Sequence, residues 1–367
     1  MNKSQSILII NKNTCCHNIQ KMAEKCKKNH VSLRPHVMAH HSAQIAEWYK
    51  AYGIDKISVS SLDAAEYFSN HGWEDITVTV PINIHNVDLL NRLNDKIKIQ
   101  IVIEHLSTLK ALEDKISKEI SLFLKIDVDG EILGISAANT TKIEKIIKYL
   151  STNKDKYHFK GFISHPYHTF LCKTRHGINN IHYNTILQLR RLKNMFQCYF
   201  PNIELGVGDT LSALICNDFR NIDELQPSAF IFNDALTWKL GACKLEDIAL
   251  RIQTSVIAKN KSRNEIVIQA NESHLTRNSY INVDGKPLYG RIIKKDNDKD
   301  VLLSELNYIH KVSLTHATIK VTPSEFFKIQ RGDIIEVVPV KAPATFNSCQ
   351  WAITEEGEII RSMLQIG

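Results

Sequence analysis

The strongest constraint on this chain is an alternation between short apolar segments and stretches of helical periodicity, which runs from residue 31 to residue 232. The clearest helical stretch is residues 141–150, where Thr141 and Glu144 match a capping box and apolar residues recur at helical spacing. Strands that alternate with helices pair in parallel, and eight such units favour a (β/α)8 barrel, which we expect over residues 11–235. The expected strands are residues 31–37, 56–60, 75–80, 97–104, 120–127, 159–164, 203–206 and 229–232.

The pattern changes after residue 236. Turn signals such as Asp284-Gly285 and Arg331-Gly332 separate β-rich segments there, several of which alternate with a period of two. We therefore expect a separate antiparallel β-domain over residues 236–367, and we expect the strand-like residues 1–10 to join it. Its clearest strands are expected in residues 265–270, 314–321, 333–340 and 351–360.

Charge and cysteine content narrow the class of protein. The 46 Lys and Arg residues outnumber the 39 Asp and Glu residues, but they are spread along the whole chain, so we expect no nucleic-acid partner. The eight cysteines form no C-x-x-C pair, which indicates reduced thiols and favours the cytoplasm. The apolar run at residues 7–10 is too short for a secretory segment, and no later run is long enough to span a membrane.

Several motifs carry a family resemblance. Arg34-Pro35-His36-Val37 ends the first expected strand, and further blocks follow at Lys125-Ile126-Asp127 and at residues 161–165 and 206–210. With these motifs, the chain resembles the fold-type III pyridoxal-phosphate enzymes of the D-threonine aldolase and D-serine dehydratase group, whose barrel is of the alanine racemase type. The resemblance covers nearly the whole chain. It implies pyridoxal phosphate as the family cofactor and a homodimer in which the partner's β-domain completes each site.

The resemblance breaks at the position of the reactive lysine. The family motif R-P-H-x-K-T-H places Met38 where the Schiff-base lysine stands. A thioether has no amine to condense with an aldehyde, so we predict that covalent attachment of the cofactor is absent. Lys341 lies on another element, which makes it an improbable replacement.

Further departures occur at other family positions. Lys341 and Pro343 occupy the positions of the family's metal ligands, so we predict no metal site there. The resemblance also aligns Ile132 with an arginine near the cofactor, Phe170 with a tyrosine and Ser228 with a glycine.

One part of the family site is retained. The segment from Gly206 to Ser212 resembles the loop that holds the cofactor phosphate, although Leu211 replaces the usual proline. A phosphate or another small anion could therefore bind there. The candidate binding residues are Gly206, Gly208, Asp209, Thr210 and Ser212.

Histidines supply the candidate catalytic groups. His36, His40, His165 and His168 are expected at one rim of the barrel, with Asp127 and Asp209 nearby, where they could act as acid and base or bind a transition metal. We favour the simpler interpretation that most of them are inherited from the family pocket. His316, in the β-domain, matches a histidine that the family places beside its cofactor, and a structural role is equally consistent with its sequence.

The combined losses favour a diverged protein that has given up pyridoxal-phosphate Schiff-base chemistry. It would be a pseudoenzyme, a partner subunit or a recruited catalyst in a biosynthetic or amino-acid pathway. The alternative is an active pyridoxal-phosphate-dependent lyase or dehydratase on D-3-hydroxy amino acids. We expect a small anionic or amino-acid-like ligand, and a homodimer or a heterodimer with a paralogue.

Overall fold

The structure is a computed structural model, which describes residues 6–128, 130, 133–296 and 299–365. The chain divides into two compact units. The first, made of residues 20–38 and 46–228, contains a parallel sheet, and the second, made of residues 1–19, 39–45 and 229–367, contains the β-domain. No helix among the described residues is long and apolar enough to cross a membrane.

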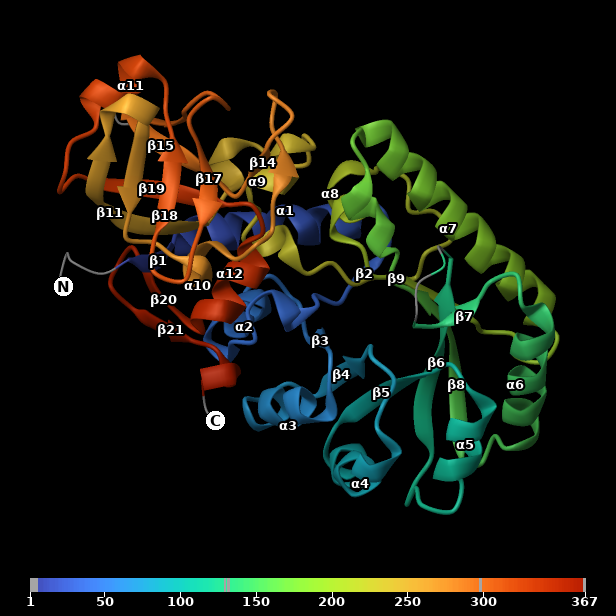
Figure 1. Ribbon diagram of the computed structural model, residues 1–367. Helices are drawn as coiled ribbons and strands as arrows, with labels where there is room; N and C mark the ends of the chain where they lie inside the picture. The colour runs from blue at the N-terminus through green and yellow to red at the C-terminus, as the bar shows by residue number, and fades with distance from the viewer. Residues whose placement is uncertain (1–5, 129, 131–132, 297–298, 366–367) are drawn as a thin grey trace. The chain divides into compact units, whose positions relative to one another are not determined.

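Eight parallel strands of the described chain form the barrel in the order β2, β10, β9, β8, β6, β5, β4 and β3 (Figure 1). At their carboxyl ends β2 and β3 approach each other, because Ser58 N donates to Pro35 O at 2.9 Å and His36 forms a single parallel bridge with Ser58. The expected barrel is thereby confirmed and is nearly closed. The strands are β2 (Ser32–Leu33), β3 (Lys56–Val59), β4 (Asp75–Val78), β5 (Lys98–Ile103), β6 (Ile120–Asp127), β8 (Tyr157–Ser164), β9 (Glu204–Val207) and β10 (Glu224–Leu225); the short β7 (Ile135–Ser136) pairs with β6.

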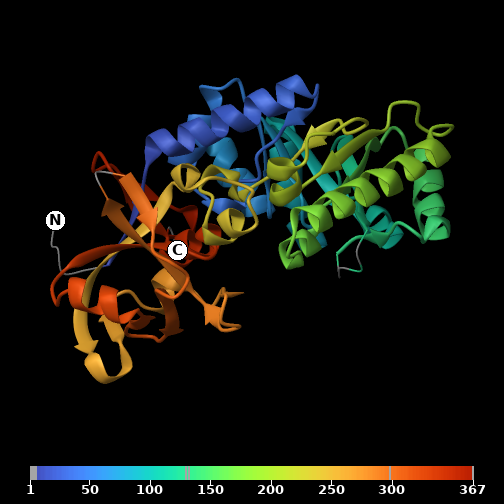
Figure 2. The same ribbon diagram turned by 90° about the horizontal axis from the view of Figure 1, so that it is seen from above.

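Helices cover the outside of this sheet. The long helix α7, which is drawn in yellow-green in Figure 2, runs along the parallel strands. In α6, the apolar residues at helical spacing are buried, as their periodicity predicts. The cap of α6 is Asn139, whose side chain accepts from Lys142 N at 3.1 Å, and not the expected Thr141. The helices up to residue 215 are α1 (Lys12–Lys28), α2 (Ala43–Lys50), α3 (Leu62–Asn70), α4 (Val87–Lys96), α5 (Leu106–Leu112), α6 (Thr140–Thr152), α7 (Arg175–Phe196) and α8 (Thr210–Ile215).

The last barrel strand differs from the sequence prediction. Residues 229–232 were expected as a strand because they form an apolar run, but residues Ala229–Ile231 form a short 3-10 helix, all of it buried. The eighth strand is β10, only two residues long, which pairs with β2 and β9. A short apolar run predicts burial, but it does not distinguish a strand from another buried conformation.

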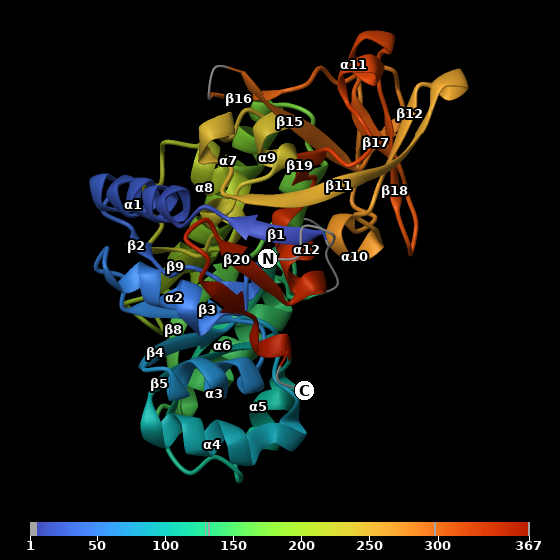
Figure 3. The ribbon, with the colours of Figure 1, turned by 90° about the vertical axis from the view of Figure 1, so that its left-hand side faces the viewer.

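The β-domain is built on one large, mainly antiparallel sheet, as expected. Its strands follow the order β12, β18, β17, β15, β19, β11, β1, β20 and β21, with β16 beside β15, and a further β11–β12 pairing joins two strands of the path. Strand β1 lies between β11 and β20 (Figure 3), antiparallel to the first and parallel to the second, so the N-terminal strand joins this domain.

The strands of the large sheet are β1 (Ile7–Ile10), β11 (Leu250–Asn260), β12 (Glu265–Ile268), β15 (Gly290–Asp296), β16 (Lys299–Leu302), β17 (Tyr308–Val312), β18 (Ala317–Lys320), β19 (Ile334–Pro339), β20 (Trp351–Thr354) and β21 (Ile359–Arg361). A separate hairpin pairs β13 (Tyr280–Ile281) with β14 (Pro287–Leu288). The helices of this part of the chain are α9 (Ala235–Lys239), α10 (Glu272–Leu275), α11 (Pro323–Lys328) and α12 (Ala342–Cys349).

Candidate functional site

Five polar side chains meet inside the barrel near the carboxyl ends of its strands. They come from or directly follow five different strands, and none is more than 8% exposed. His36 Nε2 lies 2.8 Å from Thr79 Oγ1, and Lys125 Nζ donates to Thr79 O at 3.0 Å. The rings of His36 and His165 meet edge to face with their centroids 6.4 Å apart. The five residues are His36, Thr79, Lys125, His165 and Gln226.

Hydrogen bonds fix the tautomer of His36. Met38 N donates to His36 Nδ1 at 3.2 Å, so Nδ1 carries no proton. Nε2 is therefore the protonated nitrogen and donates to Thr79 Oγ1, while the Thr79 hydroxyl donates to Val59 O at 3.1 Å. This chain of donors holds the His36 ring in one orientation.

His165 has a different environment. It is 8% exposed, and within the described part of the chain neither ring nitrogen makes a hydrogen bond of normal length and angle. Burial, together with the nearby Lys125 and His36, holds the pKa of His165 well below its usual range. The Gln226 side chain is close enough to act slightly against these effects. At neutral pH the ring is uncharged, so it offers one donor and one acceptor.

A layer of paired charges lies deeper in the barrel. Arg34 Nε donates to Glu224 Oε1 at 2.8 Å, and Arg34 Nη1 donates to Asp75 Oδ1 at 2.6 Å. Burial opposes the charge of Arg34, but Glu224 and Asp75 raise its pKa above the usual value. Arg34 and His36 belong to one sequence motif, yet the first supports the barrel and the second reaches its mouth.

The mouth of the barrel contains a cavity of about 30 Å³. Met38 and Phe170 are half-buried beside it, and His36 and His165 form part of its wall. Such a volume holds little more than a water molecule, whereas ligand pockets span about 300–1,000 Å³. The lining residues are His36, Met38, His165, Pro166, Tyr167, Phe170, Gly208, Asp209, Thr210, Gln226 and Ser228.

The loop after β9 is tightly packed against this cavity. A Cβ atom at Gly208 would lie 2.1 Å from His165 Cδ2, so only glycine lets the imidazole approach the backbone. At Gly206, a Cβ atom would meet Ile163 Cγ1 at 3.2 Å. Thr210 Oγ1 accepts from Ser228 N at 3.0 Å, and Asp209 is 4% exposed. The two glycines therefore serve packing.

The structure brings some of the predicted residues together and separates others. His36, His165, Gly208, Asp209 and Thr210 line the cavity, while the half-buried His168 lies in the short helix that follows His165. His40 and His316 belong to the unit of the β-domain. His40 Nδ1 accepts from Ser42 N at 3.0 Å, and the exposed His316 bonds to Ser313 and Thr315 within its own turn.

The remaining predicted positions are at the start of α12 and in the loop after β6. Lys341 is the cap residue of α12, and Pro343 lies in its first turn. Burial raises the pKa of Asp234, whereas the nearby Lys341 acts to lower it. Among the described residues, no group of three or more His, Cys, Asp or Glu could hold a metal ion. Ile132 lies outside the described residues.

Sequence reasoning missed three residues of the mouth. Lys125, Thr79 and Gln226 were not expected as site residues, although a lysine within the apolar run of residues 120–126 is itself a signal. A charged residue in a mostly apolar strand must find polar partners in the interior of a barrel. Thr79 and Gln226 carry no comparable signal.

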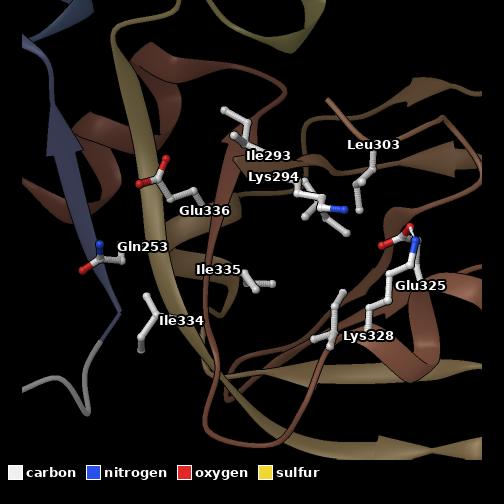
Figure 4. Close-up of a pocket in the computed structure, with 11 residues that line it drawn as sticks. Gln253, Ile293, Lys294, Leu303, Glu325, Lys328, Ile334, Ile335 and Glu336 are labelled. Carbon is white, nitrogen blue, oxygen red and sulfur yellow. Dashed lines mark hydrogen bonds and ion pairs between the residues drawn. The ribbon is translucent and has the colours of Figure 1, made fainter. Parts of the chain in front are cut away.

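The β-domain contains a larger cavity, of about 390 Å³, between β15, β19 and α11 (Figure 4). Its floor is apolar and includes Ile292 and Ile293. Three of the four charged residues in its lining are paired: Glu325 with Lys328 at 2.8 Å, and Glu336 with Arg251, outside the cavity, at 2.9 Å. Its lining contains no histidine, cysteine or serine, so we place the candidate chemistry at the barrel mouth.

Residues 10–205 match the family model described as alanine racemase, N-terminal domain. The chain belongs to this family. It is 25% identical to the D-serine dehydratase of Dictyostelium discoideum over an alignment that covers 94% of this chain and 92% of the relative. It is 22% identical to the D-threo-3-hydroxyaspartate dehydratase of Delftia sp. (strain HT23) over 265 residues, or 71% of this chain and 69% of the relative.

Solved structures agree with this assignment. The structure of the Delftia dehydratase matches with a TM-score of 0.84 and 18% identity over 97% of both chains. The D-threonine aldolase of Filomicrobium marinum matches with a TM-score of 0.78 and 16% identity over 98% of this chain and 94% of the other. The predicted resemblance to the fold-type III pyridoxal-phosphate family is confirmed.

The residues at the barrel mouth do not fit the cofactor of that family. Four donors of the expected phosphate loop and its surroundings bind the Asp209 carboxylate: Leu211 N, Ser212 N, Ser212 Oγ and Thr169 Oγ1. The cavity beside them is about one tenth of the smallest usual ligand pocket. We therefore derive no chemical step through pyridoxal phosphate.

Proposed function

We propose that this chain is a diverged member of the family that does not carry out pyridoxal-phosphate Schiff-base chemistry. The observation that carries the proposal is that Met38 lines the cavity, together with the motif resemblance, which aligns Met38 with the reactive lysine of the family. A thioether forms no Schiff base and transfers no proton near neutral pH. The protein would act as a pseudoenzyme, as a partner subunit or as a recruited catalyst that works without the cofactor.

The histidines supply what a recruited catalyst needs. His165 is neutral and lines the cavity, so it can accept a proton from a small ligand bound there. His36 accepts from Met38 N at Nδ1 and directs Nε2 toward Thr79. The ligand would be a small, amino-acid-like molecule. These features support the proposal without naming a reaction.

Cell location and assembly are part of the proposal. All eight cysteines are free thiols in the structure, which supports a reducing compartment such as the cytoplasm. We propose a dimer, either of two copies or with a paralogue that retains the lysine. Co-purification with such a paralogue, or a dimer of this chain alone in sedimentation, distinguishes the two assemblies.

The test is cofactor trapping. We expect the purified protein to show no visible absorption band with added pyridoxal phosphate, and no specific lysine adduct after borohydride reduction and peptide mass mapping. The Met38→Lys variant places an amine at the family position, and Met195→Lys, at a side chain that is 41% exposed, is the matched control. A stoichiometric adduct at one lysine of the wild-type protein contradicts the proposal.

The alternative is an active lyase or dehydratase on D-3-hydroxy amino acids. The relatives support it, since two are dehydratases, a structural neighbour is an aldolase, and their likeness covers most of this chain. It predicts ammonia and a keto acid from D-serine, or glycine and an aldehyde from D-threonine. Turnover assays with added pyridoxal phosphate and a divalent metal test this directly, and absence of product removes it.

A further inference from the structure

The loop after β9 is held together by one buried carboxylate. Asp209 Oδ1 accepts from Leu211 N at 3.1 Å and from Thr169 Oγ1 at 2.9 Å. Asp209 Oδ2 accepts from Ser212 N at 2.9 Å and from the Ser212 hydroxyl. Two of these donors are backbone N–H groups, which can only donate, so the carboxyl group serves as their acceptor.

The other polar groups of this loop are also engaged within the protein. Gly208 N donates to Ser164 O at 2.8 Å, and Thr210 Oγ1 accepts from Ser228 N at 3.0 Å. A phosphate held by a loop of this kind needs several backbone N–H groups and hydroxyls directed at its oxygens. Here the donors that would serve it already have an oxygen acceptor, the Asp209 carboxyl group, although burial raises the pKa of that group.

The adjoining cavity gives a second and independent observation. His165 is more than nine-tenths buried, and neither of its ring nitrogens nor Gln226 Oε1 makes a hydrogen bond of normal length and angle among the described residues, although the Gln226 side chain is close enough to act on the pKa of His165. Buried polar atoms whose hydrogen-bonding capacity is incompletely used favour a small polar group, or a water molecule, in the adjoining cavity. The cavity of about 30 Å³ accommodates a group of that size and not a phosphorylated ring.

We propose that Asp209 is a built-in substitute for the phosphate, so that the mouth of this barrel accepts small polar ligands without a phosphate group and excludes phosphorylated ones. The proposal rests on the proposed function and narrows its ligand class to unphosphorylated molecules that place only a small polar group in this cavity. This inference concerns the phosphate, whereas the proposed function concerns the Schiff base, so an experiment can contradict one of them and leave the other standing.

The test compares ligands that differ only in the phosphate. Binding of pyridoxal phosphate, pyridoxal and inorganic phosphate is measured by calorimetry on the full-length wild-type protein and on Asp209→Ser. Serine keeps an N-cap oxygen for α8 but removes the carboxylate. For the wild type we expect pyridoxal phosphate to bind no more tightly than pyridoxal. For Asp209→Ser we expect the phosphate to improve affinity by about tenfold or more.

A matched control separates an opened loop from general loosening. Asp234 is also a buried N-cap residue and accepts from Thr237 N at 2.9 Å and from Ala342 N at 3.1 Å. Asp234→Ser should gain no phosphate affinity. Circular dichroism and thermal melting verify that both variants are folded.

Two results overturn the proposal. One is a wild-type protein that binds pyridoxal phosphate about tenfold more tightly than pyridoxal, which is informative even if the variant does not fold. The other is a folded Asp209→Ser that gains nothing from the phosphate. A lysine adduct formed equally well with pyridoxal and its phosphate would instead overturn the proposed function and leave this inference standing.

Discussion

Replacing Arg34 by methionine should strongly destabilise the barrel. The side chain is 1% exposed and donates to Glu224, Asp75 and the carbonyl of Ile57. Removing one partner of a buried ion pair costs about 3–5 kcal/mol, because the other charge stays buried without compensation. Glu224 retains an amide donor, Gln226 Nε2, at 2.8 Å, and the Asp75 side chain is 29% exposed, so we expect the lower end, about 3 kcal/mol.

Urea unfolding followed by hydrogen exchange of peptides from β2, β4 and β10 measures this loss in the barrel. Arg92→Met is the control, since Arg92 is 64% exposed and its ion pair with Glu66 spans 3.3 Å; its cost should stay within about 0.5 kcal/mol. Arg34→Met combined with Glu224→Gln should recover part of the loss. If Arg34→Met costs less than about 1 kcal/mol, or no more than Arg92→Met, the buried network does not support the barrel as argued.

Two further predictions concern His165. Gly208→Ala puts a Cβ atom 2.1 Å from the His165 ring and should lower the unfolding free energy by about 1–3 kcal/mol in thermal unfolding. Gly177→Ala is the control, because the nearest atom to its Cβ lies at 3.3 Å, and it should be nearly neutral. Equal effects of the two substitutions would refute the packing argument. The pKa of His165 is lowered by burial, so its neutral form contributes stability above the unfolded-state pKa of about 6.5, and this is lost as the pH falls. The unfolding free energy of the wild type should therefore decline more between pH 7 and pH 5 than that of His165→Asn; parallel declines would contradict this.

Much of the fold could be predicted from the sequence, because the periodic spacing of apolar residues is clearest in the elements whose side chains are most buried. Helix α6 shows this, since Ile143, Ile146, Ile147 and Leu150 are all buried. The eighth strand was placed wrongly because β10 is only two residues long and contains Glu224, whose role depends on Arg34 from a distant part of the chain.

The site was harder to predict than the fold. The rim positions of His36 and His165 follow from strand ends, which the alternation of strands and helices reveals. The role of Asp209 depends on Thr169, a donor 40 residues earlier, and on which donors each oxygen accepts. The partners of Lys125 and Thr79 likewise come from different strands, so no local pattern indicates them.

The position of β1 constrains the order in which the β-domain can be completed during synthesis. Ser6 and Thr254, joined by a hydrogen bond of 2.7 Å, are 248 residues apart, and Ile9 pairs with Ile353. At about 5–20 residues per second, β1 waits roughly ten to fifty seconds for β11 and longer for β20. Until then its apolar side chains have no sheet to join, and a nascent chain that stalls before β20 leaves β1 with an unpaired edge that can recruit other chains.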